Sequence, residues 1–144
     1  MLISRPLRVA SMRKSDRSGT TMVEFAVVAP VFFIMVMGLF EFSRALMIQS
    51  MLAGAAQQGA RAGTLGSAQS SDVTTAVNNY LTTAGISGAS TSVSPNPPSS
   101  AYPGQNVTVT VSIPYASVSW LPSPTYLANV TLSSKALAPR ESGQ

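Results

Sequence analysis

An uncharged run of sixteen residues constrains this chain more than any other feature of its sequence. The run reads FAVVAPVFFIMVMGLF, covers residues 25–40, and lies between Glu24 and Glu41. As a helix it spans about 24 Å, or about 31 Å if it begins at Thr20. The hydrocarbon core of a bilayer is about 30 Å thick. The run therefore predicts a membrane-spanning helix, although a start at Thr20 places the Glu24 carboxylate within the apolar zone, at a cost of about 2.5–3.5 kcal/mol.

The net charge of the chain is concentrated in front of this run. The chain has 144 residues and a net charge of +4, and residues 1–17 hold five cations against one carboxylate. The remaining residues hold four of each and are neutral. Lys and Arg beside a membrane helix favour the cytoplasmic side, so we expect a cytoplasmic leader and an exported remainder. A nucleic-acid-binding domain would carry its basic patch on the folded part, so we expect no nucleic-acid partner.

Two other structures are compatible with an apolar run of this length. A buried core helix is one, but five cations precede the run and the rest of the chain is too small to enclose it. A cleaved secretory signal is the other, but its apolar region would be shorter and would end in a small-x-small cleavage site. The Ala/Gly segment 53–63 lies too far downstream for that. Pro30 within the run predicts a kink, which membrane helices tolerate.

Composition excludes most catalytic chemistry. The chain has no cysteine and no histidine, which removes disulfides, thiol nucleophiles, Cys/His zinc sites and histidine bases. Its five carboxylates are scattered, so we expect neither a metal site nor a glycosidase-type pair. We therefore predict that the protein is not an enzyme, and that it has no catalytic residue, cofactor, metal or small-molecule substrate. A small hydrolase that uses Ser or Thr is the alternative, and the missing histidine argues against it.

The junction between the leader and the apolar run reads RSGTTMVEF, residues 17–25. A basic leader ends at Gly19, and Glu24 follows five residues later. This arrangement resembles the processing site of type IV pilins and pseudopilins, where a membrane aspartyl peptidase, the prepilin peptidase, cuts after the glycine. The resemblance implies a cut between Gly19 and Thr20. It also implies that Glu24 and Phe25 are recognition and assembly residues, with Glu24 as the fifth residue of the mature chain.

A longer string, VEFAVVAPVFFIMVMGLFEFSRAL at residues 23–46, resembles the TadE-like family of minor pilins or pseudopilins of the tight-adherence (Flp/Tad) pilus. The segment QGARA at residues 58–62 is also similar to that family, although Gln57 and Gln58 stand where it would have an arginine and an acidic residue. The resemblance covers residues 17 to about 65. It implies a single-pass protein of the bacterial inner membrane, with its carboxyl-terminal domain outside, in the membrane or on a pilus at the cell surface. The implied partners are prepilin peptidase, other pilin or pseudopilin subunits, and the pilus assembly machinery.

The chemistry of the junction fits this resemblance. Glycine leaves the backbone open to a protease, because no side chain blocks the approach. Cleavage frees an α-amine that is largely protonated at neutral pH. Inside an apolar helix bundle this cation could pair with Glu24 of its own or a neighbouring subunit, which offsets desolvation and sets the assembly register. The alternative is that Glu24 lies at the membrane face and reaches water.

The helix that contains the apolar run is expected to extend from residue 22 to residue 65. Glu41 and Arg44 are three residues apart, which predicts an ion pair near the outer membrane interface. This pair would either contact a partner subunit or simply stabilise the helix. Ala55, Gly59 and Gly63 form a ridge of small residues that lets another backbone approach closely. Because glycine costs about 1 kcal/mol in an isolated helix, we expect a packing partner, either another subunit or the chain's own sheet. A solvated, alanine-rich stem is the alternative.

The last part of the chain predicts a small domain with one helix and a sheet. Ser71-Asp72 can cap a helix that ends at Gly85. Strands are expected near 91–94, at 105–113 and at 127–137, with another possible near 116–120. The aromatic side chains are expected to fill the small core and its edges rather than to form a binding surface: Tyr102, Tyr115, Trp120 and Tyr126.

The predicted fold class is α+β. A long amino-terminal transmembrane helix continues into an exported stalk, followed by a short helix and a small, mostly antiparallel sheet of three to four strands. The expected segments are a basic cytoplasmic leader (1–19), a transmembrane helix (20–44), an extracytoplasmic helix extension (45–66) and a small α+β domain (67–144). The predicted function is assembly of a tight-adherence type IV pilus, in adhesion, surface colonisation or secretion. The alternatives are an uncleaved, signal-anchored extracytoplasmic binding module, and a chaperone or regulator of another secretion machine.

Overall fold

A single helix, α1 (Arg17–Ala62), contains both the apolar run and the Ala/Gly-rich segment in this computed structural model, which describes residues 17–120 and 126–141. Pro30 lies inside α1 without ending it. The helix ends three residues before the predicted position, where the Gly63 N–H donates to the carbonyls of Gly59 and Ala60. The chain divides into two compact units, and the boundary falls within α1, between Val36 and Met37.

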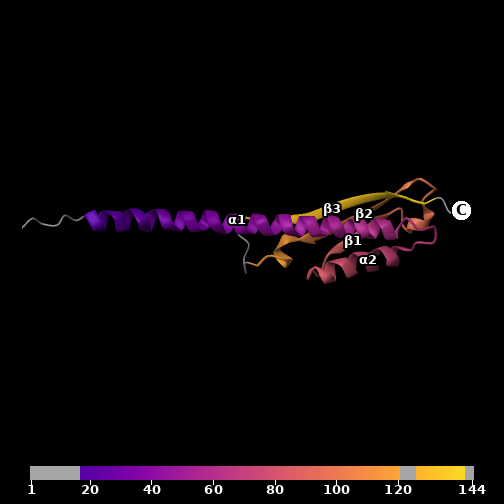
Figure 1. Cartoon of the computed structure of the whole chain (residues 1–144), viewed down its shortest axis with the longest axis horizontal. Helices are drawn as coiled ribbons and strands as arrows, with labels where there is room; N and C mark the ends of the chain where they lie inside the picture. Colours follow the sequence, from indigo (N-terminus) through magenta and orange to yellow (C-terminus); the bar gives the residue numbers. More distant parts are fainter. Residues whose placement is uncertain (1–16, 121–125, 142–144) are drawn as a thin grey trace, which may run out of the picture. The chain divides into compact units, whose positions relative to one another are not determined.

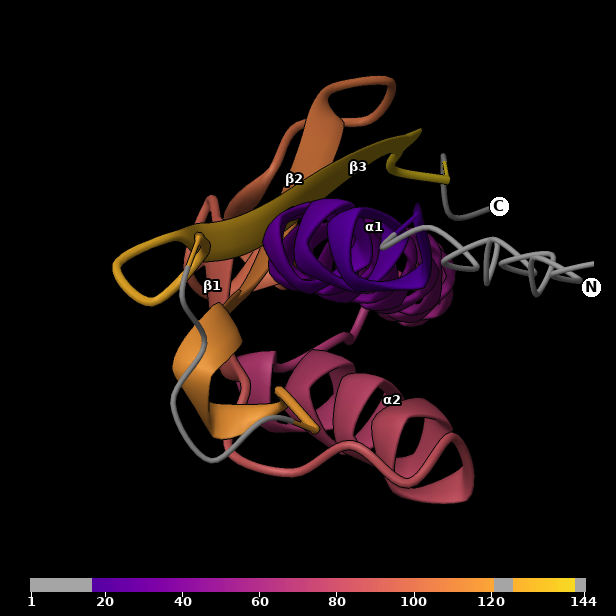
Figure 2. The same ribbon diagram turned by 90° about the vertical axis from the view of Figure 1, so that its left-hand side faces the viewer.

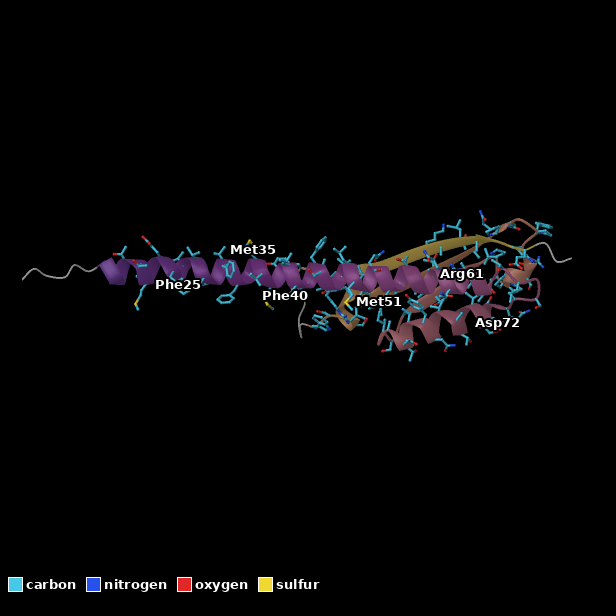
Figure 3. The ribbon with its side chains drawn as sticks, in the orientation of Figure 1. Phe25, Met35, Phe40, Met51, Arg61 and Asp72 are labelled. Carbon is cyan, nitrogen blue, oxygen red and sulfur yellow. The ribbon has the colours of Figure 1, made fainter. Side chains whose placement is uncertain are left out.

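The described part of the amino-terminal unit is the first twenty residues of α1, 17–36. Its large apolar side chains are exposed, with Phe25 at 71% and Met35 at 66%; Figure 3 labels both. Among the described residues, α1 is the one helix that is long and apolar enough to cross a membrane. The transmembrane length and apolarity predicted from the sequence are therefore present in the structure.

The carboxyl-terminal unit combines the rest of α1 with a second helix and a sheet (Figure 1). Helix α2 (Ser70–Thr83) precedes three strands: β1 (Ser90–Ser94), β2 (Asn106–Pro114) and β3 (Thr131–Pro139). The strands are antiparallel in the order β1-β2-β3, and both helices lie on the same side of the sheet (Figure 2). Two short 3₁₀ helices, η1 (Pro98–Ser100) and η2 (Tyr115–Ser117), flank β2. The predicted α+β fold class is confirmed.

The core of this unit follows the patterns that predicted it. Alternate residues of β2 are fully buried, as expected for a strand that covers a core with one face: Val107, Val109, Val111 and Ile113. Helix α2 buries Val73, Val77 and Leu81, which recur every four residues. The carboxyl-terminal half of α1 contributes Ile48 and Leu52 together with buried alanines.

Three local predictions need correction. The strand considered near 116–120 is instead η2, because Pro114 lacks the N–H that would continue a ladder and the chain turns directly after it. Strand β3 begins at Thr131, four residues later than predicted, since Leu127 accepts a hydrogen bond from the Val130 N–H in a turn. The cap of α2 also differs: Gln69 is the N-cap, and its N–H donates to the Asp72 carboxylate at 2.9 Å.

Candidate functional site

The predicted processing site lies in the first turn of α1. Gly19 and Thr20 are both exposed, and a Cβ added at Gly19 would have open space around it. Helix ends fray, so this part of the backbone is among the easiest in α1 to unwind for a protease. The cut between the two residues stays a prediction.

Glu24 and Phe25 lie one turn further along and are also exposed. Glu24 therefore stands on a helix surface whose large side chains are otherwise mostly apolar, including Val28 at the same face one turn on. A carboxylate in such surroundings is tolerated in lipid or in a helix bundle when a cation or a hydrogen-bond donor accompanies it. Its exposed position leaves it free to meet a group from outside the helix, and its role in assembly stays a prediction.

Glu41, at the other end of the apolar run, has the opposite environment. Only 1% of this residue is exposed. Its Oε2 accepts a hydrogen bond from the Tyr126 N–H at 3.1 Å, and its backbone carbonyl accepts one from the Tyr115 hydroxyl at 3.0 Å. Because a buried carboxylate is stable only with hydrogen-bonding partners, Glu41 ties both sides of the β2–β3 connection to α1.

Arg44 contacts the same connection from the next turn of α1. Its Nε donates to the Val118 carbonyl at 3.3 Å, and its guanidinium carbon lies 4.6 Å from the centre of the Trp120 ring. That geometry is a cation–π interaction. The contacts recorded for Arg44 and Glu41 thus run to different parts of the β2–β3 connection, and an ion pair between the two stays a prediction.

Two exposed aromatic residues of the β2–β3 connection lie at this end of the carboxyl-terminal unit. Tyr115 is fully buried, as predicted, but Trp120 is 70% exposed and Tyr126 54% exposed. Of the four aromatic residues expected in the core or at its edges, Tyr115 is therefore in the core, whereas Trp120, Tyr126 and Tyr102, which is 78% exposed at the other end of β2, lie outside it. All three lie in the connections between strands, outside β1, β2 and β3.

The ridge of small residues on α1 has its partner within the chain. A Cβ added at Gly59 would lie 2.6 Å from Cγ2 of Val77 on α2 and 3.2 Å from Cγ1 of Val109 on β2. A Cβ at Gly63 would meet Val107 at 3.0 Å. Glycine is needed here because α1 meets α2 and the sheet at van der Waals distance. Of the two partners expected from the sequence, the structure has the chain's own sheet, together with α2.

The polar residues of the described segments 17–120 and 126–141 do not form a metal centre. No three of their Asp or Glu side chains come together as ligands would. The site residues predicted from the sequence lie in two stretches of α1: Gly19, Thr20, Glu24 and Phe25 at its start, and Glu41 with Arg44 just beyond the apolar run.

Comparison with family models identifies residues 19–61 as matching the TadE-like protein family. The match runs from the predicted cleavage site to the last turn of α1, and contains Glu24, Glu41 and Arg44. It confirms the resemblance predicted from the sequence and associates this chain with Tad pilus proteins. Comparison with curated proteins and with solved structures yields no match.

Proposed function

We propose that this chain, whose first helix is TadE-like, is a membrane-anchored minor pilin or pseudopilin that acts in assembly of a tight-adherence type IV pilus. The observation that carries the proposal is the coincidence of two features in α1. The family match covers residues 19–61, and the same helix exposes an apolar surface that is long enough for a membrane. The protein acts by anchoring and assembly and not by catalysis.

The exposed surface of the amino-terminal unit supports the anchoring step. Soluble proteins rarely leave such contiguous apolar surface in water, so lipid or neighbouring helices must cover it. The basic leader before it favours insertion with the amino terminus in the cytoplasm and the carboxyl-terminal unit exported. A helix inserted in this way can later leave the lipid for a bundle of like helices, because both environments are apolar.

Processing supplies the second step of the proposal. A cut after Gly19 by prepilin peptidase would remove the cytoplasmic cations and create an ammonium group at Thr20. Glu24 is exposed one turn away, so it can pair with this amine or with that of a neighbouring subunit. The pair would form only when two subunits reach the correct offset, which gives Glu24 a role in register.

The mass of the mature protein tests the proposal. Cleavage after Gly19 removes 19 of 144 residues from a 15.0-kDa chain, which is about 2 kDa. We expect this loss in a host that has the peptidase, and we expect Gly19→Val to abolish it. Gly66→Ala serves as the matched control, because its surroundings leave room for a Cβ and it lies far from the cut.

The result that overturns the proposal is an amino terminus at Met1 in cells that possess the peptidase. Such a chain would instead be the uncleaved, signal-anchored binding module. A wild-type chain that stays full length only when the peptidase gene is deleted supports processing by that enzyme.

A further inference from the structure

Trp120 and Tyr126 lie level with the carboxyl-terminal end of the apolar run. The Tyr126 ring packs on α1 at Gly38, where an added Cβ would be 3.2 Å from the ring atom Cε2. Its N–H is bound by Glu41, and Trp120 lies under the guanidinium of Arg44. Two exposed aromatic side chains from a distant part of the sequence are thus fixed beside residues 38–44.

The exposed apolar surface of α1 ends at this same level. Phe40, Phe42, Leu46 and Met47 are exposed, and the next large apolar residues, Ile48 and Leu52, are buried in the core. Figure 3 labels Phe40 on this stretch and Met51 just beyond it. The exposed large apolar side chains of α1 therefore stop within about one turn of Arg44.

The length needed to span a membrane also places residues 38–44 at the outer membrane boundary. A helix rises 1.5 Å per residue, so a hydrocarbon core of about 30 Å needs about twenty residues. With Glu24 at the inner boundary, twenty further residues reach Arg44. The segment 38–44, with the aromatic rings packed on it, thus falls at the outer boundary between hydrocarbon and headgroups.

We propose that Phe40, Phe42, Arg44, Trp120 and Tyr126 form an interfacial cluster that seats the carboxyl-terminal unit on the lipid headgroups of the outer membrane face. This inference rests on the proposed membrane anchoring. Trp and Tyr are the side chains that favour this zone, because one end is apolar and the other forms hydrogen bonds. Arg44 adds a cation with several N–H donors, which suits a lipid phosphate.

Glu41 is the positioning residue of this cluster. Its carboxylate and its backbone carbonyl hold the Tyr126 N–H and the Tyr115 hydroxyl, so both ends of the β2–β3 connection are fixed relative to α1. The carboxyl-terminal unit therefore meets the lipid with a set of side chains from two distant parts of the sequence.

The single tryptophan of the chain makes the proposal testable by fluorescence. The full chain is reconstituted in vesicles of phosphatidylcholine and phosphatidylglycerol that carry a spin label either near the headgroup or deep in the acyl chain. The matched control is the double variant Trp120→Phe/Tyr102→Trp. Tyr102 is exposed and precedes β2, while Trp120 follows it, so the two rings are separated by a strand of about 30 Å.

We expect the headgroup label to quench Trp120 severalfold more strongly than the deep label. Aqueous iodide should quench Trp120 severalfold less than it quenches the tryptophan of the control, which should respond to neither lipid label. Flotation of the same vesicles measures anchoring separately.

The outcomes separate the inference from the function on which it rests. A chain that floats with the vesicles but leaves Trp120 open to iodide and insensitive to both labels overturns the interfacial cluster alone. Protection from iodide without quenching by either lipid label also overturns it, because a neighbouring subunit would then cover the rings. A chain that does not float overturns membrane anchoring and the inference together.

Discussion

The two halves of α1 share one backbone conformation and have opposite surfaces. From Phe25 to Phe40 the large side chains are mostly exposed, whereas from Ala45 to Gly63 the small and apolar positions are mostly buried against α2 and the sheet. A helix is stabilised mainly by packing of its apolar positions, and the described residues provide such packing for the second half. Within the described residues 17–120 and 126–141, the large apolar side chains of the first half are thus exposed, whereas those of the second half belong to the core.

The carboxylates that bracket the apolar run show the same contrast on a smaller scale. Glu24 is exposed, while Glu41 is buried and bound to the connection between β2 and β3. The sequence predicts an assembly role for Glu24 and an ion pair with Arg44 for Glu41, but it does not predict this difference in exposure. The contacts of Glu41 belong to the fold of the carboxyl-terminal unit, and the role of Glu24 in assembly stays a prediction.

The largest effect is expected when charge is placed on the exposed apolar surface in the first half of α1. Phe32→Arg/Phe33→Arg adds two cations at positions that are exposed and apolar. At about 2.5–3.5 kcal/mol each by insertion scales, the pair should cost about 5–7 kcal/mol and remove most of the chain from the membrane fraction after alkaline extraction.

The matched control for that variant is a cation in the second half. Gln57→Arg lies on an exposed position of α1 in the carboxyl-terminal unit and should leave membrane retention unchanged. Full retention of the double variant would mean that lipid does not cover the first half.

Added side-chain volume should destabilise the protein in the second half of α1 and not in the first. Gly59→Leu places a side chain where even a Cβ would be 2.6 Å from Val77, so we expect a loss of about 3 kcal/mol in the free energy of unfolding. Ala26→Leu, at an exposed position of the first half, should leave the unfolding transition in place. The measurement is thermal unfolding in detergent micelles, followed by near-ultraviolet circular dichroism. Equal melting temperatures for the two variants would contradict the packing of α1 between α2 and β2.

The sequence predicted the features that depend on neighbouring residues. The alternation of Val107, Val109 and Val111 identified the central strand, and the spacing of Val73 and Val77 identified the buried face of α2. Both patterns are local consequences of strand and helix periodicity. The membrane-length helix could also be predicted, because the length of an uncharged run follows directly from the sequence.

The contacts of Glu41 could not be predicted in this way. Its partners Tyr115 and Tyr126 are 74 and 85 residues away in the sequence, and no periodicity relates them to α1. The exposure of Trp120 was missed for the same reason, because it depends on how the chain leaves β2 after Pro114. One signal was available: two aromatic residues in Pro- and Ser-rich loops suit an interface better than a core with few positions for large side chains.

Neutralising each of the two carboxylates in turn should have the smallest effect on stability. Glu41→Gln keeps the shape of the side chain and an oxygen that can accept from the Tyr126 N–H, but replaces a charged acceptor with a neutral one. Charge-assisted hydrogen bonds contribute more than neutral ones, so we expect a loss of about 1 kcal/mol in the free energy of unfolding of the carboxyl-terminal unit. Glu24→Gln should leave that unfolding unchanged and should instead reduce pilus formation, counted by electron microscopy. If Glu41→Gln abolished pili at unchanged stability while Glu24→Gln assembled normally, the two residues would have exchanged the roles assigned to them, because assembly would then depend on the buried carboxylate.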